Sequence, residues 1–185
     1  MEMSEPIRHL FGYSIEDILS AMPSPDDPSW DFFALRQNKE HVHRATRTMA
    51  FAWSERWDGI GVPVVLWPDY APAPLRAAVA DCAEAIRAHF GGLVTRVILA
   101  ELPPGTEIAA HVDGGPLLTM VHRCHVPILT NPGVVFAIDG VDQKMRAGQV
   151  YELDNMRRHG VANHGTERRI HLICNVLPSA IKRSA

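Results

Sequence analysis

The second half of the chain most constrains its fold, because from Val94 onward short runs of β-prone residues alternate with turn signals. Runs rich in β-branched and aromatic residues, separated by pairs that contain Pro or Gly, predict short strands joined by tight turns. Many short strands in succession are typical of a sandwich or barrel, and a jelly roll of the cupin type fits this pattern. The runs cover residues 95–101, 108–112, 117–129, 134–138, 149–153 and 169–176.

Two helices are predicted before this β-rich part. Residues 72–90 repeat apolar side chains with the 3.6-residue period of a helix, and Gly91-Gly92 ends the pattern. We expect this helix to pack on a sheet. A shorter helix is predicted over residues 15–19, with Ser14 as its N-cap.

The chain is expected to form one domain, because 185 residues suit a single hydrophobic core. Residues 1–40 read as a helical and loop-rich arm, and residues 41–185 as the β-rich body. Two further strands are predicted in the body, over residues 46–53 and 62–67. The predicted fold class is therefore mainly β with flanking helices.

Composition argues against several functional classes. The net charge of −3 and the isoelectric point near 6.3 do not favour a broad basic surface for nucleic acid. No apolar run approaches the roughly 18–20 residues of a membrane span, and residues 1–10 do not read as a signal peptide. The three cysteines form no CxxC pair, which favours a reducing, cytoplasmic location.

The triplet His111-Val112-Asp113 is the centre of the functional argument. Residues two apart in a strand share a face, so His111 and Asp113 can bind one ion while Val112 points the other way into packing. His159 supplies a third ligand, and His164 is its rival. Two histidines and one carboxylate leave three octahedral positions open, the arrangement of non-haem Fe(II) oxygenases. A structural zinc site would instead be closed by four protein ligands.

A predicted strand begins at Arg169, ten residues after His159. An antiparallel return of this length can place the Arg169 guanidinium inside the barrel, near the third ligand. A buried unpaired charge is very costly, so a guanidinium in this place needs an anion. Because an arginine fork binds a carboxylate through two hydrogen bonds, we expect Arg169 to hold a carboxylate.

Several sequence blocks, in order, resemble the aspartyl/asparaginyl β-hydroxylase family of Fe(II)/2-oxoglutarate-dependent dioxygenases, which includes bacterial hydroxylases of free amino acids. The resemblance covers roughly residues 40–178. It implies a double-stranded β-helix fold, with Fe(II) as cofactor and 2-oxoglutarate and O2 as co-substrates. The blocks that carry it are Leu102-Pro103-Pro104-Gly105, His111-Val112-Asp113, Ala147-Gly148-Gln149-Val150-Tyr151-Glu152-Leu153-Asp154-Asn155, His159-Gly160-Val161-Ala162-Asn163 and Arg169-Ile170-His171-Leu172-Ile173.

The resemblance also implies roles for single residues. His111, Asp113 and His159 match the iron ligands, and Arg169 matches the residue that binds the distal carboxylate of 2-oxoglutarate. Some members of the family have Gly in place of the carboxylate ligand, whereas this chain retains Asp113. Its presence argues against a halogenase, in which a halide takes that coordination position.

A second pair of basic residues is matched less directly. Arg123 and His125 alternate onto one face of a predicted strand and match the pair that contacts the carboxylate nearer the metal. His122 offers another register for this pair. We expect no catalytic side chain beyond the metal centre.

The activity implied by the resemblance is hydroxylation of an sp3 carbon in an amino acid or peptidyl residue, of the Asp, Asn or Pro class. 2-Oxoglutarate would be converted to succinate. A small molecule or short peptide is the expected partner, with no nucleic acid and no membrane, and the oligomeric state stays open. Two alternatives remain: a cupin-type metalloenzyme that uses no 2-oxoglutarate, and a non-catalytic metal- or ligand-binding module.

Further polar residues are candidates for supporting roles. His43, Arg44 and Arg47 begin the first predicted strand of the body, where they are either solvated or form a wall that faces substrate. Asn155 and Asn163 are expected to hold the loop around His159 through backbone hydrogen bonds, which orients a metal ligand.

Other conspicuous side chains are given structural roles. His171 is expected to pack beside Arg169 while facing away from it, and Arg168 is expected to be solvated. Trp53, Trp57 and Trp67 are read as core or rim packing.

Overall fold

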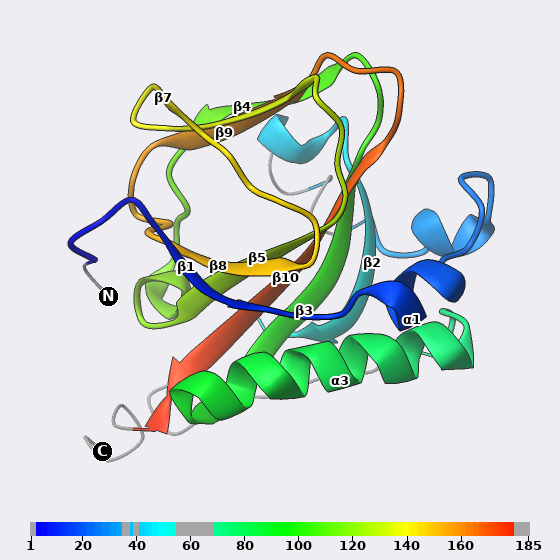
Figure 1. Cartoon of the computed structure of the whole chain (residues 1–185), viewed down its shortest axis with the longest axis horizontal. Helices are drawn as coiled ribbons and strands as arrows, with labels where there is room; N and C mark the ends of the chain where they lie inside the picture. Colours follow the sequence, from blue (N-terminus) through cyan, green and yellow to red (C-terminus); the bar gives the residue numbers. More distant parts are fainter. Residues whose placement is uncertain (1–2, 35–37, 39–40, 55–68, 180–185) are drawn as a thin grey trace.

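The computed structural model describes residues 3–34, 38, 41–54 and 69–179. In these residues two antiparallel β-sheets face each other, and a long helix covers the outside of one of them (Figure 1). The fold class is mainly β with flanking helices in a double-stranded β-helix, as predicted. No helix in the described residues is long and apolar enough to cross a membrane.

The larger sheet contains, in spatial order, β1 (Ile7–Gly12), β8 (Gln149–Leu153), β5 (His122–Leu129), β10 (Arg169–Pro178), β3 (Gly92–Leu102) and β2 (Arg47–Trp53). The smaller sheet contains β4 (Thr106–His111), β9 (His159–Asn163), β6 (Val134–Ile138) and β7 (Val141–Gln143). Among the described residues lie the helices α1 (Glu16–Ser20) and α3 (Ala73–Phe90) and the 3-10 turns η1 (Pro28–Trp30), η2 (His41–His43) and η3 (Pro116–Thr119).

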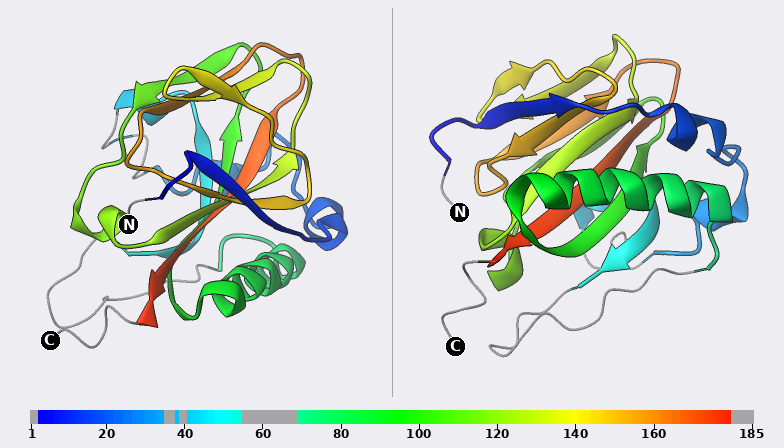
Figure 2. Two further views of the ribbon diagram at one scale, coloured as in Figure 1. Left: turned by 60° about the vertical axis from the view of Figure 1, so that its left-hand side comes forward. Right: turned by 60° about the horizontal axis from the view of Figure 1, so that its bottom comes forward.

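Helix α3 lies across the outer face of the larger sheet, against β3 and β10 (Figure 2). Its buried stripe includes Leu75, Val79 and Ile86, which pack with the outer-facing side chains of those strands. The chain leaves the helix at Gly91, whose φ of 67° lies in the left-handed region that glycine adopts at little cost. The helix predicted over residues 72–90 is therefore confirmed, as is its packing on a sheet.

The space between the two sheets contains both apolar and charged side chains. Its apolar members, such as Phe136 of β6 and Val161 of β9, form a cluster separate from the core under α3. Arg169 of β10 is buried in the same interior and ranks among the largest fully buried side chains. The interior between the sheets therefore combines apolar packing with buried charge, and buried charges are stable only with polar partners.

The N-terminal arm differs from its prediction. Within the described part of residues 1–40, β1 pairs with β8 and forms an edge strand of the larger sheet, where only helix and loop were expected. Helix α1 has Ile15 at its N-cap position and no side-chain cap, so the capping role predicted for Ser14 is wrong.

The β-rich half also departs from its prediction in places. Residues 116–119 form the turn η3, so the strand predicted over residues 117–129 is shorter and begins at His122. Strands β7 and β9 were not predicted, because both are short and β9 lacks a continuous run of β-prone residues. The strand predicted over residues 62–67 lies outside the described residues.

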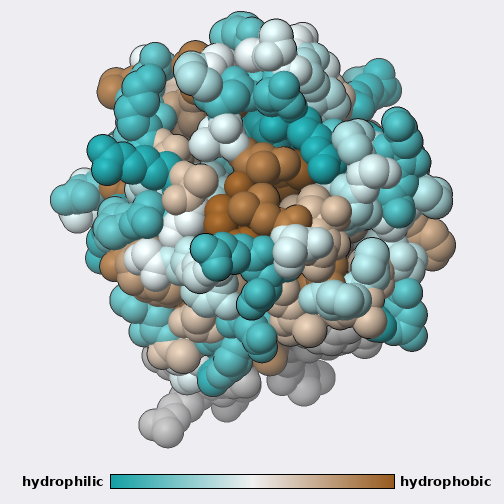
Figure 3. All heavy atoms as spheres, turned by 45° about the vertical axis from the view of Figure 1, so that its right-hand side comes forward, coloured by the Kyte–Doolittle hydropathy of each residue, from teal (hydrophilic) through white to brown (hydrophobic). Residues whose placement is uncertain are grey.

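The molecular surface on the right-hand side of Figure 1 carries both hydrophobic and hydrophilic residues. Figure 3 shows an apolar area near the centre of this face, with hydrophilic side chains above and below it and pale to tan residues of intermediate hydropathy at its left and lower right. Isolated apolar areas of this kind are ordinary on folded proteins.

A buried glutamate of β8, Glu152, links the edge strand β1 to β5 within the larger sheet. The Glu152 carboxylate accepts hydrogen bonds from Arg8 of β1 and, at 2.6 Å, from Nδ1 of His122. The His122 ring in turn stacks on Phe90 at the end of α3, with ring centroids 3.8 Å apart. Burial alone would raise the pKa of Glu152, but the hydrogen bonds from His122 and Arg8 outweigh burial and lower that pKa.

We predict that Glu152→Gln lowers the free energy of unfolding by about 2–3 kcal/mol near pH 7, because it breaks a buried, charge-assisted cluster. The pKa of Glu152 is depressed in the folded state, so this stabilisation is full above the ordinary glutamate pKa, about 4.3, and is lost as the pH falls through the folded-state value. Denaturant unfolding at several pH values measures the effect. Glu84→Gln, in an exposed pair with Arg87, is the control and should change little.

Candidate metal centre

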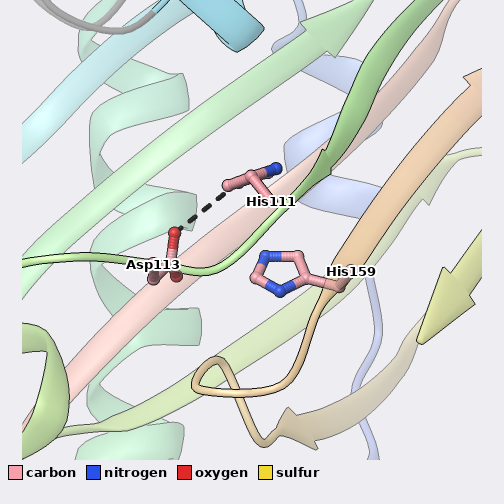
Figure 4. A group of neighbouring side chains, drawn as sticks. All are labelled: His111, Asp113 and His159. Atoms are coloured by element: carbon pink, nitrogen blue, oxygen red, sulfur yellow. Dashed lines mark ion pairs between the residues drawn. The ribbon is translucent and has the colours of Figure 1, made fainter. Parts of the chain in front are cut away.

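Three side chains predicted to bind one ion lie together between the sheets. His111 is the last residue of β4, Asp113 follows in the adjoining loop, and His159 is the first residue of β9 (Figure 4). The antiparallel register places His111 directly opposite His159. One possible ligand atom from each of the three residues lies within 4.8 Å of the others. The structure therefore brings these residues together, as the sequence predicted.

Both histidines are held in the same way by the backbone. Nδ1 of His111 lies 2.8 Å from the carbonyl oxygen of Ala109, and Nδ1 of His159 lies 2.9 Å from that of Arg157. A carbonyl oxygen can only accept, so each Nδ1 must carry the proton. Each Nε2 is then left with a lone pair, which is the form of imidazole that binds a metal.

Asp113 is oriented by three contacts. Its Oδ1 lies 3.7 Å from Nε2 of His111, its Oδ2 lies 3.1 Å from Nε of Arg123, and its backbone N–H donates to the carbonyl of Asn155. Asp113 itself lies beyond the end of β4, so the loop and not a regular strand sets its direction. Val112 was predicted to point into packing, but its side chain is exposed because the strand has already ended.

Close packing of β4 on β9 supports this geometry. A Cβ atom at Gly160 would lie 3.0 Å from the backbone of Ala110, so any larger residue here would push the two strands apart. Burial lowers the pKa of the adjacent His159, which the Asp113 carboxylate only partly offsets, and keeps the imidazole neutral near pH 7. The donor set of two imidazoles and a carboxylate fits Fe(II) and leaves further coordination positions open.

His111 and His159 line a pocket between the sheets, and Asp113 lies beside it, in contact with the lining residue Arg123. Arg169 of β10 and Arg123 and His125 of β5 reach the same pocket, and all three are buried. The complete lining is His43, Thr46, Ala100, Glu101, Ile108, His111, Arg123, His125, Phe136, His159, Gly160, Val161, Arg169 and Ile173.

Positive charge dominates this pocket. Arg123 and Arg169 line it with two guanidinium groups, whereas Asp113, which contacts Arg123 from outside the lining, adds one carboxylate. Glu101 also borders the pocket, but its Oε2 lies 3.7 Å from Nη1 of Arg168. Burial, together with the charge of Arg123, lowers the pKa of His125 well below its usual range. A divalent metal would add to the positive charge, so the pocket favours an anionic ligand.

The structure also discriminates between the alternatives that the sequence left open. His122 faces the outside of the sheet, where it contacts Glu152, so the interior register belongs to Arg123 and His125. His164 is exposed and does not belong to the group around His159.

Two structural roles predicted near the pocket are wrong. His171 was expected to face away from Arg169, yet residues two apart on β10 share a face, and His171 is buried beside His125. Arg168 was expected to be solvated, but it donates to the carbonyl of Pro23 and lies over the Trp30 ring. It thus fixes the N-terminal arm to the body.

The three residues proposed as a substrate-facing wall separate in the structure. His43 is buried in the pocket, with its ring centroid 5.2 Å from that of His111. Arg47 points out of the opposite face of β2 and binds Asp31 through two hydrogen bonds, at 2.9 and 2.8 Å. Arg44 is exposed and contacts His41. Of the three, only His43 lines the pocket, so its neighbours do not form the predicted wall.

The two asparagines hold backbone around the centre. Asn155 donates to the carbonyl of Leu118, and Asn163 donates to those of Leu102 and Glu167. The expected backbone hydrogen bonds are therefore present, although Asn163 lies in β9 and not in a loop. Trp53 packs against Arg96, as expected, whereas Trp57 and Trp67 lie outside the described residues.

Sequence reasoning missed Asn175, whose Oδ1 lies 3.4 Å from Nη1 of Arg123. It also assigned no role to Phe136, which lines the pocket wall. The alternation of β10, counted in steps of two from Arg169, could have placed Asn175 on the interior face.

Solved structures provide a comparison of fold. An oxidoreductase of the 2OG-Fe(II) oxygenase family from Burkholderia pseudomallei is 13% identical, with a TM-score of 0.51 over 71% of this chain and 67% of that chain. A predicted oxalate decarboxylase from Thermotoga maritima is 22% identical, with a TM-score of 0.37 over 51% and 72%. A non-heme monooxygenase solved as a nickel complex is 17% identical, with a TM-score of 0.44 over 57% and 54%.

Sequence comparison identifies the family directly. No curated protein matches the chain. The profile of the family described as aspartyl/asparaginyl beta-hydroxylase matches residues 20–178, which is most of the chain and includes every residue of the metal centre. The chain therefore belongs to the aspartyl/asparaginyl beta-hydroxylase family.

Proposed function

We propose that the protein is an Fe(II)- and 2-oxoglutarate-dependent dioxygenase that hydroxylates an sp3 carbon of an amino acid or peptidyl residue. One observation carries the proposal: two histidines with Nε2 lone pairs and one carboxylate converge beside a pocket that holds buried guanidinium groups. Membership of the hydroxylase family and the oxygenase fold of the Burkholderia protein support it.

His111, Asp113 and His159 would hold Fe(II) on one face and leave the opposite positions to co-substrates. Bound Fe(II) would supply O2 activation, which places one oxygen atom in the substrate hydroxyl and the other in succinate as 2-oxoglutarate loses CO2. The protein's part is to hold the reactants, keep both Nε2 atoms unprotonated and exclude water from the apolar wall around Phe136 and Val161.

2-Oxoglutarate suits the charge of the pocket because it carries two carboxylates. The Arg169 guanidinium would bind the distal carboxylate, since its fork matches a carboxylate through two hydrogen bonds. Arg123 and His125 would bind the carboxylate nearer the metal. Arg123 already contacts Asp113, so it can orient a metal ligand and a co-substrate together.

The substrate would enter beside His43 and Thr46, which line the pocket next to His111. Membership of the aspartyl/asparaginyl beta-hydroxylase family favours a single amino acid or one peptidyl side chain of the Asp, Asn or Pro class as the substrate. Arg44 and Arg47 have other partners and are not part of this proposal.

Two other functions make different demands on the same residues. A cupin-type metalloenzyme without 2-oxoglutarate would need the metal ligands but not Arg169. A non-catalytic binding module would consume no O2 when supplied with any substrate. The burial of Arg169 in the pocket of the metal ligands favours the dioxygenase.

We predict that Arg169→Ala raises the KM for 2-oxoglutarate about 100-fold or more, because it removes the partner of a buried carboxylate. Arg169→Lys retains the charge but not the fork and should restore affinity only in part. Succinate formation at varied 2-oxoglutarate concentration measures the effect. Unchanged kinetics in Arg169→Ala would instead favour the cupin-type enzyme.

Metal binding gives a separate prediction. His159→Ala should weaken binding of Fe(II), or of Mn(II) as an air-stable probe, by more than about 100-fold, since even a residue that only supports a ligand contributes 10- to 100-fold. The matched control is His164→Ala, an exposed histidine five residues later, which should bind metal as the wild type does. Anaerobic calorimetric titration measures both, and equal affinities would contradict this ligand set.

A further inference from the structure

Two interior histidines that belong to different strands contact each other beside the metal centre. His125 of β5 and His171 of β10 are both buried, with ring centroids 5.7 Å apart. Their Nδ1 atoms lie 3.4 Å apart, within hydrogen-bonding distance. His125 lines the pocket of the metal ligands, whereas His171 lines a second pocket on the other side of Phe136, which borders both. The histidine pair therefore spans the wall between two pockets.

This contact constrains the position of every proton in the pair. Burial lowers the pKa of both histidines well below the usual range, helped by the charges of Arg123 and Arg169, so both rings are neutral near pH 7. A neutral imidazole has one N–H and one lone pair, and a contact between two Nδ1 atoms needs one of each. Only two arrangements satisfy this condition. In one, Nε2 of His125 carries a proton and Nε2 of His171 has the lone pair, and in the other the two roles are exchanged.

The surroundings of the two Nε2 atoms select one arrangement. Nε2 of His125 is buried and has no hydrogen-bond partner among the described residues. The second pocket, which His171 lines, offers donors in the side chains of Gln143, Lys144 and Arg146, so Nε2 of His171 is placed to accept and its Nδ1 to donate to Nδ1 of His125. Nε2 of His125 then carries the proton, which a carboxylate in the metal pocket could accept.

We propose that His171 is a positioning residue: its Nδ1–H fixes His125 in the tautomer whose Nε2–H faces the metal pocket, ready to donate to the carboxylate of the co-substrate. The role of His125 toward that carboxylate rests on the proposed function. The control of its tautomer by His171 does not, because the contact between the two rings and the donors of the second pocket exist without any ligand. A fixed partner at Nδ1 also sets the tautomers of His111 and His159. In those two residues Nδ1 donates to a carbonyl oxygen, whereas in His125 Nδ1 accepts.

The inference is tested by reading the tautomers directly. Two-bond 1H–15N spectra of the full chain, labelled at histidine and loaded with Zn(II) as a diamagnetic ion, distinguish Nε2–H from Nδ1–H. We expect Nε2–H at His125 and Nδ1–H at His171, both without and with 2-oxoglutarate. In His171→Leu the His125 signal should shift to a mixture of tautomers, and in His171→Asn, which retains a donor amide at the same reach, it should stay Nε2–H.

A binding titration on the same zinc-loaded proteins separates this inference from the proposed function. His171→Leu should weaken 2-oxoglutarate binding about 10-fold, since one hydrogen bond contributes roughly this factor, whereas His171→Asn should stay within about 3-fold of the wild type. Nδ1–H at His125 in the wild type, or an unchanged tautomer in His171→Leu, would overturn the inference. Failure of every protein to bind 2-oxoglutarate would instead reject the proposed function, while the tautomer without ligand still decides the role of His171.

Discussion

The pairing of β4 with β9 is the constraint on which the metal centre depends. Antiparallel register places His111 opposite His159, and opposed residues in such a pair are neighbours on one face of the sheet. The missing side chain at Gly160 lets the strands approach closely beside both histidines. Backbone carbonyl groups also fix both imidazoles through their Nδ1 atoms. The backbone therefore sets both the position of each histidine and which of its ring nitrogens carries the proton.

Around this pair the larger sheet supplies charge and the smaller sheet supplies apolar surface. Strands β5 and β10 bring Arg123, His125, Arg169 and His171 inward, which is an unusual content for a barrel interior. Such groups are costly to bury and are retained where a ligand or a polar network uses them. Meanwhile α3 stabilises the outer face of the same sheet through an ordinary apolar core, so the interior is free to serve binding.

Much of this was predictable from the sequence, because the informative patterns were local. The period of residues 72–90 gave the helix, and the spacing of His111 and Asp113 gave two ligands. Two of the wrong predictions concern contacts between residues far apart in the sequence. Residues 7–12 form the strand β1 by pairing with β8, and Arg47 forms an ion pair with Asp31. The face of His171 was predicted wrongly, although the alternation of side chains along β10 places it on the same face as Arg169. In this strand the two-residue period alone predicts which side chains lie in the interior.

We propose that this centre binds Fe(II) and 2-oxoglutarate together, which visible absorption of the anaerobic, iron-loaded protein can test. A 2-oxo acid chelated to Fe(II) gives a weak charge-transfer band in the visible range. We predict that this band appears when 2-oxoglutarate is added to the wild type and is lost in His111→Ala. A fully iron-loaded wild type that gives no band at saturating 2-oxoglutarate would contradict joint binding at this centre.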